Sequence, residues 1–365
     1  MLKKLKIGVL MGGPSAEHEV SLATGANVVA NLDKTKYKPV VIKILAPSLN
    51  KRFLSPKASA CCSAGSKTQK MHWLLNGKRT TPDKALKSCD LIFNALHGTF
   101  GEDGRVQALM EYYGARYTGS GITASALAMD KLRSREMFKL AGFCVPKTLK
   151  IKKGENYQAR LGIFITKITK LPVVVKPCSN GSSVGVQIIS ATQRAPLQRC
   201  PLKLIKAIDE TFKLDKKVLV EEFIKGREVT CGVLDGVEVK PQYVERFKLN
   251  PDGALPVTEI VPVKGHKFFN YDAKYKTGHC QEITPAQIDE MTREEVQNIA
   301  VRAHQLLGCR GYSRTDMILK NDSVYVLEVN TLPGLTSNSL FPKAAQVAGL
   351  TFSQLLDNII NSSLS

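Results

Sequence analysis

The chain has 365 residues, of which 43% are hydrophobic, so it exceeds one ordinary compact unit and predicts two or three domains. No apolar run approaches the roughly 20 residues that a membrane span needs, and residues 1–7 lack the apolar stretch of a signal peptide; we therefore expect a cytoplasmic protein. The net charge of +20 favours anionic partners, but the lysines are spread along the chain without a basic helix or an aromatic strand signature, which indicates a solvated surface rather than a nucleic-acid site.

The first third of the chain alternates apolar strands with helices. The predicted buried strands are 7–11, 40–44 and 91–96. A glycine-containing turn follows the first strand, and a helix with Glu17 and Glu19 in its early turns comes next. This order predicts a parallel sheet that binds ligands at the carboxyl ends of its strands. The polar segment 46–88 predicts an insertion that contains a hairpin with a turn at Asn76-Gly77.

A second region begins after a predicted helix at about 124–141, which ends at Gly142. Its predicted strands are 173–176, 185–189, 218–224, 315–319 and 324–329, with helices at 292–307 and at the C-terminus. The nine cysteines include no C-x-x-C pair, so the common zinc and redox spacings are excluded and buried free thiols are favoured.

The predicted hairpin at the end of this region carries a candidate metal site. A turn centred on Asp322 places Asp316 across from Glu328, and strand alternation puts Asn330 on the same face as Glu328. Two carboxylates and an amide oxygen are hard ligands that suit magnesium held together with phosphates. The alternative is an exposed charged hairpin, which we disfavour because Glu328 lies in an apolar run.

A glycine- and serine-containing loop follows the strand that ends in Lys176. Its backbone N–H groups, with Ser182 and Ser183, suit the binding of phosphates, and Lys176 adds a positive charge. The G-x-x-x-x-G-K-[ST] pattern of a P-loop is absent from the sequence. An ordinary hairpin turn looks similar, so the loop is informative only together with the metal hairpin.

The segment Glu221-Glu222-Phe223-Ile224 fits an adenosine slot. A linker strand offers backbone N–H and C=O groups to adenine, and Glu228 offers a carboxylate to the ribose hydroxyls. An ordinary strand with a charged end explains the same residues equally well.

Two further polar groups follow strands of the predicted parallel sheet. Glu17 lies at the first strand-to-helix turn, where a carboxylate can hold a substrate ammonium. A dinucleotide loop is the alternative there, but the G-x-G-x-x-G spacing is absent. His97 follows the strand at 91–96 and is bracketed by glycines, so we expect it close to Glu17 at the same sheet edge.

Taken together, these motifs resemble the D-alanine–D-alanine ligase family of the ATP-grasp superfamily. The matching segments, in chain order, are 12–21, 96–98, 101–104, 129–131, 176–185, 272–275, 314–316, 328–334 and 336–340. The resemblance implies an α/β, three-domain ATP-grasp architecture. Its expected parts are an N-terminal Rossmann-like substrate domain (1–125), a central ATP-grasp subdomain (126–222) and a C-terminal ATP-grasp subdomain with the metal site and lid (223–365).

The resemblance also implies a reaction. The family transfers the γ-phosphoryl group of ATP to the carboxylate of one D-alanine, and the amine of a second D-alanine attacks the acyl phosphate; the product serves peptidoglycan synthesis. Two magnesium ions, or manganese, are implied at Asp316, Glu328 and Asn330. Lys131 and Lys176 are expected to neutralise phosphate oxygens.

The remaining roles are carried over in the same way. Glu17 is expected to bind the ammonium of the first D-alanine with His97 beside it, and Arg314 and the N–H of Gly334 face the oxyanion. The second substrate's carboxylate is received by Ser339 and its neighbour Leu340.

A lid is expected at 265–282, whose lysines, aromatics and glycines suit closure over the site, although an irregular surface loop has the same composition. Within it, Lys274 reaches the γ-phosphate, and Tyr275 completes a hydrogen-bonded chain with Ser182 and Glu17. We expect a homodimer that takes D-alanine and ATP and has no nucleic-acid or membrane partner. A D-alanine–D-lactate ligase is the nearest alternative, and a nucleic-acid-binding protein is the alternative from another class.

Overall fold

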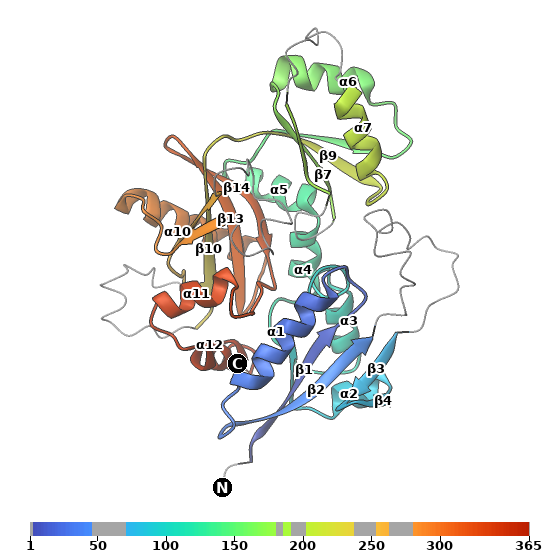
Figure 1. Ribbon diagram of the computed structural model, residues 1–365, viewed down its shortest axis with the longest axis vertical. Helices are drawn as coiled ribbons and strands as arrows, with labels where there is room; N and C mark the ends of the chain where they lie inside the picture. Colours follow the sequence, from blue (N-terminus) through green and yellow to red (C-terminus); the bar gives the residue numbers. More distant parts are fainter. Residues whose placement is uncertain are drawn as a thin grey trace.

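The computed structural model describes residues 3–45, 71–179, 185–190, 202–236, 253–262 and 280–364. The predictions for Ser182, Ser183, Lys274 and Tyr275, and for most of the expected lid, lie outside these residues. Three sheets organise the chain, and Figure 1 shows them one above another with the first sheet at the bottom, the second in the middle and the third at the top. The α/β prediction is confirmed.

The first sheet has the order β4-β3-β2-β1-β5 and contains the predicted parallel strands. Its strands are β1 (Leu5–Gly12), β2 (Tyr37–Leu45), β3 (His72–Leu75), β4 (Lys78–Thr80) and β5 (Leu91–Asn94). Strand β1 is parallel to both β2 and β5, so the turns that follow β1 and β5 lie at one edge, as expected. The accompanying helices are α1 (His18–Asn31), α2 (Pro82–Lys87) and α3 (Arg105–Tyr112).

The described part of the 46–88 segment contains the predicted hairpin. Asn76 and Gly77 both have positive φ angles, 46° and 83°, which is the backbone of a tight two-residue turn between β3 and β4. The short helix α2 was not predicted. It begins with Pro82 in its first turn, where a missing N–H costs no helical hydrogen bond.

The second sheet has the order β12-β11-β10-β13-β14. Its strands are β10 (Arg227–Leu234), β11 (Thr258–Pro262), β12 (Cys280–Ile283), β13 (Tyr312–Lys320) and β14 (Ser323–Asn330). Its associated helices are α10 (Glu290–Leu306), α11 (Leu340–Val347) and α12 (Phe352–Asn361), and α12 is the predicted C-terminal helix.

The predicted single helix at 124–141 is wrong, because the structure has two helices there, α4 (Ile122–Met129) and α5 (Lys131–Leu140). Asp130 separates them with an extended backbone, φ −81° and ψ 91°, and its side chain accepts hydrogen bonds from the N–H groups of Leu132 and Arg133. It is therefore the N-cap of α5. The predicted end is confirmed, since Gly142 has a φ of 84° just beyond α5.

The third sheet has the order β6-β9-β7-β8 and is antiparallel throughout. Its elements are β6 (Thr148–Lys152), α6 (Gln158–Ile163), the π-helix η2 (Phe164–Ile168), β7 (Val173–Pro177), β8 (Gln187–Ile189), α7 (Leu202–Thr211) and β9 (Lys217–Glu222). Strand β9 ends two residues earlier than predicted, so Phe223 and Ile224 have left the sheet.

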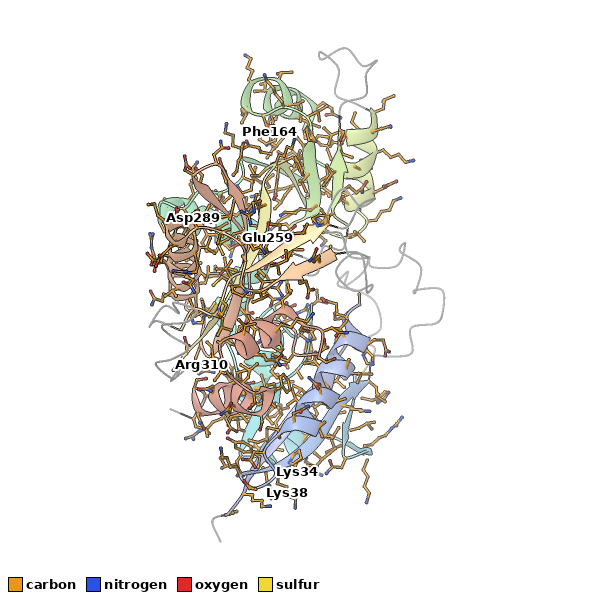
Figure 2. All side chains as sticks on the ribbon, turned by 60° about the vertical axis from the view of Figure 1, so that its left-hand side comes forward. Lys34, Lys38, Phe164, Glu259, Asp289 and Arg310 are labelled. Carbon is orange, nitrogen blue, oxygen red and sulfur yellow. The ribbon has the colours of Figure 1, made fainter. Side chains whose placement is uncertain are left out.

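The sheets differ in how their apolar faces are buried. One face of the first sheet shares a core with residues of β10, β13, α11 and α12, whereas α2 and α3 cover its other face. Helices α4, α5 and α10 pack against the second sheet. In the described part of the chain, every member of the third sheet's core lies between residues 149 and 220. Figure 2 labels Phe164 in that unit, at the opposite end of the molecule from Lys34 and Lys38.

The two predicted boundaries between the three domains, at 125/126 and 222/223, stay predictions. Within the described residues, none of the helices combines the length and apolar character that crossing a membrane requires.

Candidate active site

The turn between β1 and α1 positions Glu17. The Ser21 hydroxyl accepts a hydrogen bond from the Gly12 N–H (2.8 Å) and donates to the Ala95 carbonyl (2.7 Å), which ties this turn to the end of β5. Glu17 is the N-cap residue of α1, and its own N–H donates to the Ser15 hydroxyl at 2.9 Å. Its side chain is buried in spite of its charge, so the carboxylate lies at the sheet edge and not in bulk solvent.

A close approach at Gly98 brings the second polar turn against the first. Gly98 has a φ of 68°, and a Cβ built on it would lie 2.5 Å from Glu17 Oε2 and 2.4 Å from Ser15 Oγ. Only glycine fits this conformation and this space. The prediction that Glu17 and the His97 loop share one sheet edge is confirmed.

Hydrogen bonds fix the His97 ring on both sides. Its Nε2 lies 2.9 Å from Thr24 Oγ1, and its Nδ1 lies 3.4 Å from Glu102 Oε1, which also accepts from the Gly98 N–H at 3.0 Å. A neutral imidazole satisfies both contacts when Nδ1 donates to the carboxylate and Nε2 accepts from the threonine hydroxyl. His97 is thereby oriented at the wall of the site.

The hairpin of β13 and β14 pairs Asp316 with Glu328 as predicted, but its turn is Asn321-Asp322 between the paired Lys320 and Ser323, so the predicted centre on Asp322 is wrong. Asp316 is directly opposite Glu328, and Arg314 is opposite Asn330. An irregularity follows Asp316, because Met317 pairs with Val326, so Leu327 is the extra residue of a β-bulge. The bulge allows Glu328 to face Asp316.

Each carboxylate of the hairpin is paired with a cation. Arg314 donates two hydrogen bonds of 2.8 Å to Asp316, which also accepts from Thr230 Oγ1 at 2.8 Å. Lys131 Nζ lies 3.0 Å from Glu328 Oε2. The hairpin therefore collects two acids and two bases in a small volume.

The donor set of this hairpin fits magnesium. Asn330 adds an amide oxygen that accepts from the Leu332 N–H at 2.9 Å and retains a second lone pair. Among the described residues, no cluster of three or more histidine, cysteine, aspartate or glutamate side chains could hold a metal. Oxygen ligands without nitrogen or sulfur are typical of magnesium, which also takes ligands from phosphates and water.

A buried charge cluster joins α5 to the third sheet. Lys176 Nζ is 3.0 Å from Glu221 Oε2, and the guanidinium of Arg135 pairs with Glu221 Oε1. Burial raises the pKa of the Glu221 carboxyl, but Arg135 and Lys176 outweigh that effect and hold it below its usual value. Burial, aided by Arg135, lowers the pKa of Lys176 to about 8.

The expected adenosine slot spans two sheets. Glu222, Phe223 and the buried Ile224 lead out of β9, and Glu228 lies in β10 opposite Ile318. The intervening link passes close to β13, since a Cβ on Gly226 would lie 2.1 Å from the Leu319 carbonyl. The carboxylate of Glu221 is engaged with Arg135 and Lys176, so in this slot Glu221 offers its backbone groups.

The start of α11 forms a third wall. Ser339 is the N-cap residue of α11, and its hydroxyl lies 2.8 Å from Thr336 Oγ1 and accepts from the Thr336 N–H at 3.1 Å. A Cβ on Gly334 would lie 2.9 Å from this hydroxyl. A helix N-terminus with exposed N–H groups suits an anionic group such as a carboxylate.

A cavity of about 430 Å³ connects these walls. Predicted site residues that line it are Glu17, His97, Lys131, Arg314, Glu328, Asn330, Gly334, Ser339 and Leu340. The other described site residues lie outside this lining. Asp316 is hydrogen-bonded to the lining residue Arg314. Lys176 and residues 221–224 belong to or follow strands of the third sheet, and Glu228 lies in β10 of the second sheet.

Sequence reasoning missed three supporting residues. Thr230 orients Asp316, Glu102 orients His97, and Arg135 joins Glu221 to the rest of the site. Two of them carried a usable signal: Glu102 lies in the matching segment 101–104, and Arg135 follows Lys131 by four residues and so shares one face of a helix.

This combination of a parallel-stranded domain, two further sheets and an oxygen-ligand hairpin facing buried lysines defines the ATP-grasp fold. Family models match most of the chain: "D-ala D-ala ligase N-terminus" covers residues 6–120 and "D-ala D-ala ligase C-terminus" covers residues 137–361.

Known proteins of similar sequence and structure agree with these matches. The D-alanine–D-alanine ligase of Citrifermentans bemidjiense is 38% identical over 99% of this chain and 97% of its own length. The ligase of Bacillus anthracis, solved in complex with ATP, superposes with a TM-score of 0.69 at 32% identity and covers 99% of this chain and 97% of that one. The VanG D-Ala:D-Ser ligase of Enterococcus faecalis has a TM-score of 0.73 at 30% identity, with 99% and 100% covered. The chain belongs to the D-alanine–D-alanine ligase family.

Proposed function

We propose that this chain joins two D-alanine molecules into D-alanyl-D-alanine at the expense of ATP, for use in peptidoglycan synthesis. The observation that carries the proposal is the cavity that Glu17, Arg314, Glu328 and Ser339 line together. It offers a carboxylate for an ammonium, cations for a carboxylate and phosphates, and a helix N-terminus for a second carboxylate. Membership of the ligase family across nearly the whole chain supports the same reaction.

In the first step, a carboxylate oxygen of D-alanine attacks the γ-phosphorus of ATP, the bond from that phosphorus to the β,γ-bridging oxygen breaks, and ADP leaves. Glu17 holds the substrate ammonium, and Lys131 and Lys176 neutralise phosphate oxygens. This division of labour fits a reaction in which positioning and electrostatic stabilisation supply most of the catalysis. The product is D-alanyl phosphate.

Asp316, Glu328 and Asn330 would hold magnesium, which neutralises charge on the phosphates when bound. Arg314 pairs with Asp316 and Lys131 pairs with Glu328, so these two cations would lie beside the same phosphates. The chain's own residues therefore supply both signs of charge that a nucleotide with its metal needs.

In the second step, the amine of another D-alanine attacks the acyl carbon, a C–N bond forms, the C–O bond to phosphate breaks and the ammonium proton is lost. Arg314 and the Gly334 N–H stabilise the oxyanion, because both donors are held in fixed directions. Ser339 and Leu340 receive the second carboxylate at the start of α11, and His97 lies beside the first substrate.

The nucleotide side of the site comprises the second and third sheets. There, the adenine binds the link that contains Glu222, Phe223 and Ile224, and Glu228 binds the ribose. Ser182, Ser183, Lys274 and Tyr275 keep the roles expected from the sequence, which stay predictions. A homodimer in the cytoplasm is likewise a proposal.

The acceptor is the least constrained part of this function. The similarity to a D-Ala:D-Ser ligase favours a test of D-serine beside D-alanine, and D-lactate tests the ester-forming alternative. The residues around Ser339, at the start of α11, determine which acceptor binds.

The proposal is tested by incubating the purified chain with ATP, magnesium and D-alanine, and measuring ADP and the dipeptide by mass spectrometry. We expect ADP and D-alanyl-D-alanine in equal amounts, with L-alanine inactive, and D-serine and D-lactate as weaker acceptors. Absence of D-alanine-dependent ADP formation would overturn the proposal. Salt-sensitive retention on DNA without ligase activity would instead favour the nucleic-acid alternative.

A further inference from the structure

One buried guanidinium contacts both sheets that form the nucleotide side of the site. Arg135 lies on α5 one turn after Lys131, and only 4% of its surface is exposed. On the third sheet its Nη1 donates to Glu221 and, at 3.2 Å, to the Thr148 hydroxyl. On the second sheet its Nε and Nη2 donate to the Leu327 carbonyl at 3.4 and 3.1 Å.

The contact with Leu327 falls at the bulge of β14. Leu327 is the unpaired residue of the bulge, and Glu328 follows it. Bulges redirect the side chains beside them and leave backbone groups without ladder partners. The Leu327 carbonyl accepts two hydrogen bonds from Arg135, which replace its missing partner in the ladder. The backbone beside Glu328 is thereby held in one orientation.

The contact with Glu221 acts on the other side. Glu221 pairs with Val174 in register, so its carboxylate reaches Lys176, two residues further along β7. Arg135 and Lys176 share this one carboxylate, and the cluster with Lys131 and Glu328 has three positive and two negative groups. The cluster thus has a surplus positive charge, and its members Lys131 and Glu328 line the cavity.

We propose that Arg135 is a positioning residue that sets the distance between the phosphate-binding Lys176 and the metal-binding Glu328 by bridging Glu221 and the Leu327 carbonyl. This inference rests on the proposed function, because the phosphate role of Lys176 and the metal role of Glu328 belong to it. Arg135 itself is assigned no contact with substrate. A fork with several N–H donors is required, because two acceptors on different sheets lie in different directions. A lysine ammonium can keep the charge but reaches one side well at a time.

The competing explanation is a buried ion pair that only supports the fold. Removing one partner of such a pair destabilises a protein strongly, so a loss of stability alone does not decide the question. A positioning role additionally predicts that nucleotide binding and the turnover number change, while the KM for D-alanine, which depends on the Glu17 side, does not.

The experiment compares Arg135→Met, Arg135→Lys and the control Arg133→Met. Arg133 is on the same helix, but 70% of its side chain is exposed and its Nε lies 3.8 Å from the Asp130 carboxylate. ADP affinity is measured by calorimetry with magnesium and without D-alanine. The kcat, the KM values for ATP and D-alanine, and the thermal unfolding of each variant are measured next. We expect Arg135→Met to weaken ADP binding about tenfold or more, Arg135→Lys to recover part of the loss, and Arg133→Met to match wild type.

A double-mutant cycle with Glu221→Gln separates the two explanations. If Arg135 acts through Glu221, the loss of ADP affinity in Arg135→Met/Glu221→Gln is well below the product of the two single losses. If the double variant loses ADP affinity by the full product of the two single losses, the inference is overturned. It is also overturned if folded Arg135→Lys or Arg135→Met protein binds ADP as tightly as wild type. Wild type that binds ADP but makes no dipeptide would overturn the proposed function and leave the Arg135 inference standing on its binding data; wild type that binds no ADP would overturn both.

Discussion

The two sides of the cavity are built in different ways. On the D-alanine side, the first sheet and the C-terminal helices share one apolar core. Arg310, labelled in Figure 2, adds to this connection by donating to the carbonyls of Tyr117 and Gly119 and by lying 5.3 Å from the centre of the Tyr117 ring. On the nucleotide side, the third sheet has its own core and reaches the second sheet through the buried charges of Arg135, Glu221 and Lys176.

This difference teaches how the enzyme divides its tasks. Apolar burial is strong and non-directional, so the shared core keeps Glu17 and Ser339 at a fixed separation without using their polar groups. Charged hydrogen bonds are directional and respond to a bound anion, so the third sheet is placed by the same kind of interaction that binds phosphate. Substitutions on one side should therefore affect one set of substrates at a time.

The largest effect is expected at the metal hairpin. Glu328→Gln removes a charge that pairs with Lys131 and that we propose as a magnesium ligand, so turnover should fall by about 10³-fold or more while the fold is retained. Circular dichroism and steady-state kinetics check both statements. Asp322→Asn, in the exposed turn of the same hairpin, is the control; near-normal turnover in Glu328→Gln would contradict the metal assignment.

The next largest effect is expected on the D-alanine side alone. Gly98→Ala places a methyl group against Glu17 Oε2, so the KM for D-alanine should rise about 10- to 100-fold while ADP affinity stays unchanged. Gly114→Ala is the matched control, because Gly114 has a similar φ of 67° but a Cβ added there would meet nothing within 4 Å. If the two variants behave alike, backbone strain rather than contact with Glu17 explains the result.

A smaller effect is expected from pH on the nucleotide side. Because the pKa of Lys176 is lowered to about 8, ADP affinity should fall by up to about tenfold per unit as pH rises through this value. The folded chain then releases a proton that the unfolded chain keeps up to its ordinary lysine pKa, so Lys176 makes stability rise with pH above about 8. Calorimetric titration with ADP between about pH 6.5 and 9.5 tests the binding statement. Lys176→Arg keeps its charge and should show a flat profile; a wild-type profile that is equally flat would count against the assignment.

The smallest effect on activity is expected from the cores. Leu356→Ala in the shared core and Leu204→Ala in the third-sheet core both remove a fully buried leucine, and each should cost about 2–5 kcal/mol of local or global stability. Hydrogen exchange should show faster exchange on both the first and second sheets for Leu356→Ala, but mainly on the third sheet for Leu204→Ala. If both variants showed faster exchange on all three sheets, the third sheet would not be a separate cooperative unit.

Much of this arrangement could be predicted from the sequence, because local patterns determine it. Short apolar runs located β1, β2 and β5, and the spacing of Asp316 and Glu328 predicted that they pair, although a bulge rather than a turn centred on Asp322 produces that pair. Short-range rules also located the Asn76-Gly77 turn.

The misses have a common physical reason. Asp130 was read as part of a helix, although its side chain competes for the backbone N–H groups of the next turn and so caps a new helix. Arg135 and Thr230 act through groups that only tertiary packing brings near them, namely the Leu327 carbonyl and the Asp316 carboxylate. A bulge that creates such an acceptor leaves no periodic signal in the sequence.

The central claim is that the cavity activates a D-alanine carboxylate as an acyl phosphate. The most direct measurement uses D-alanine with both carboxylate oxygens replaced by ¹⁸O, followed by mass analysis of the inorganic phosphate released during dipeptide formation. The account predicts that each phosphate carries one ¹⁸O atom, because the oxygen that attacks the γ-phosphorus leaves with it when the amine displaces phosphate. Unlabelled phosphate, or AMP in place of ADP, would contradict the account.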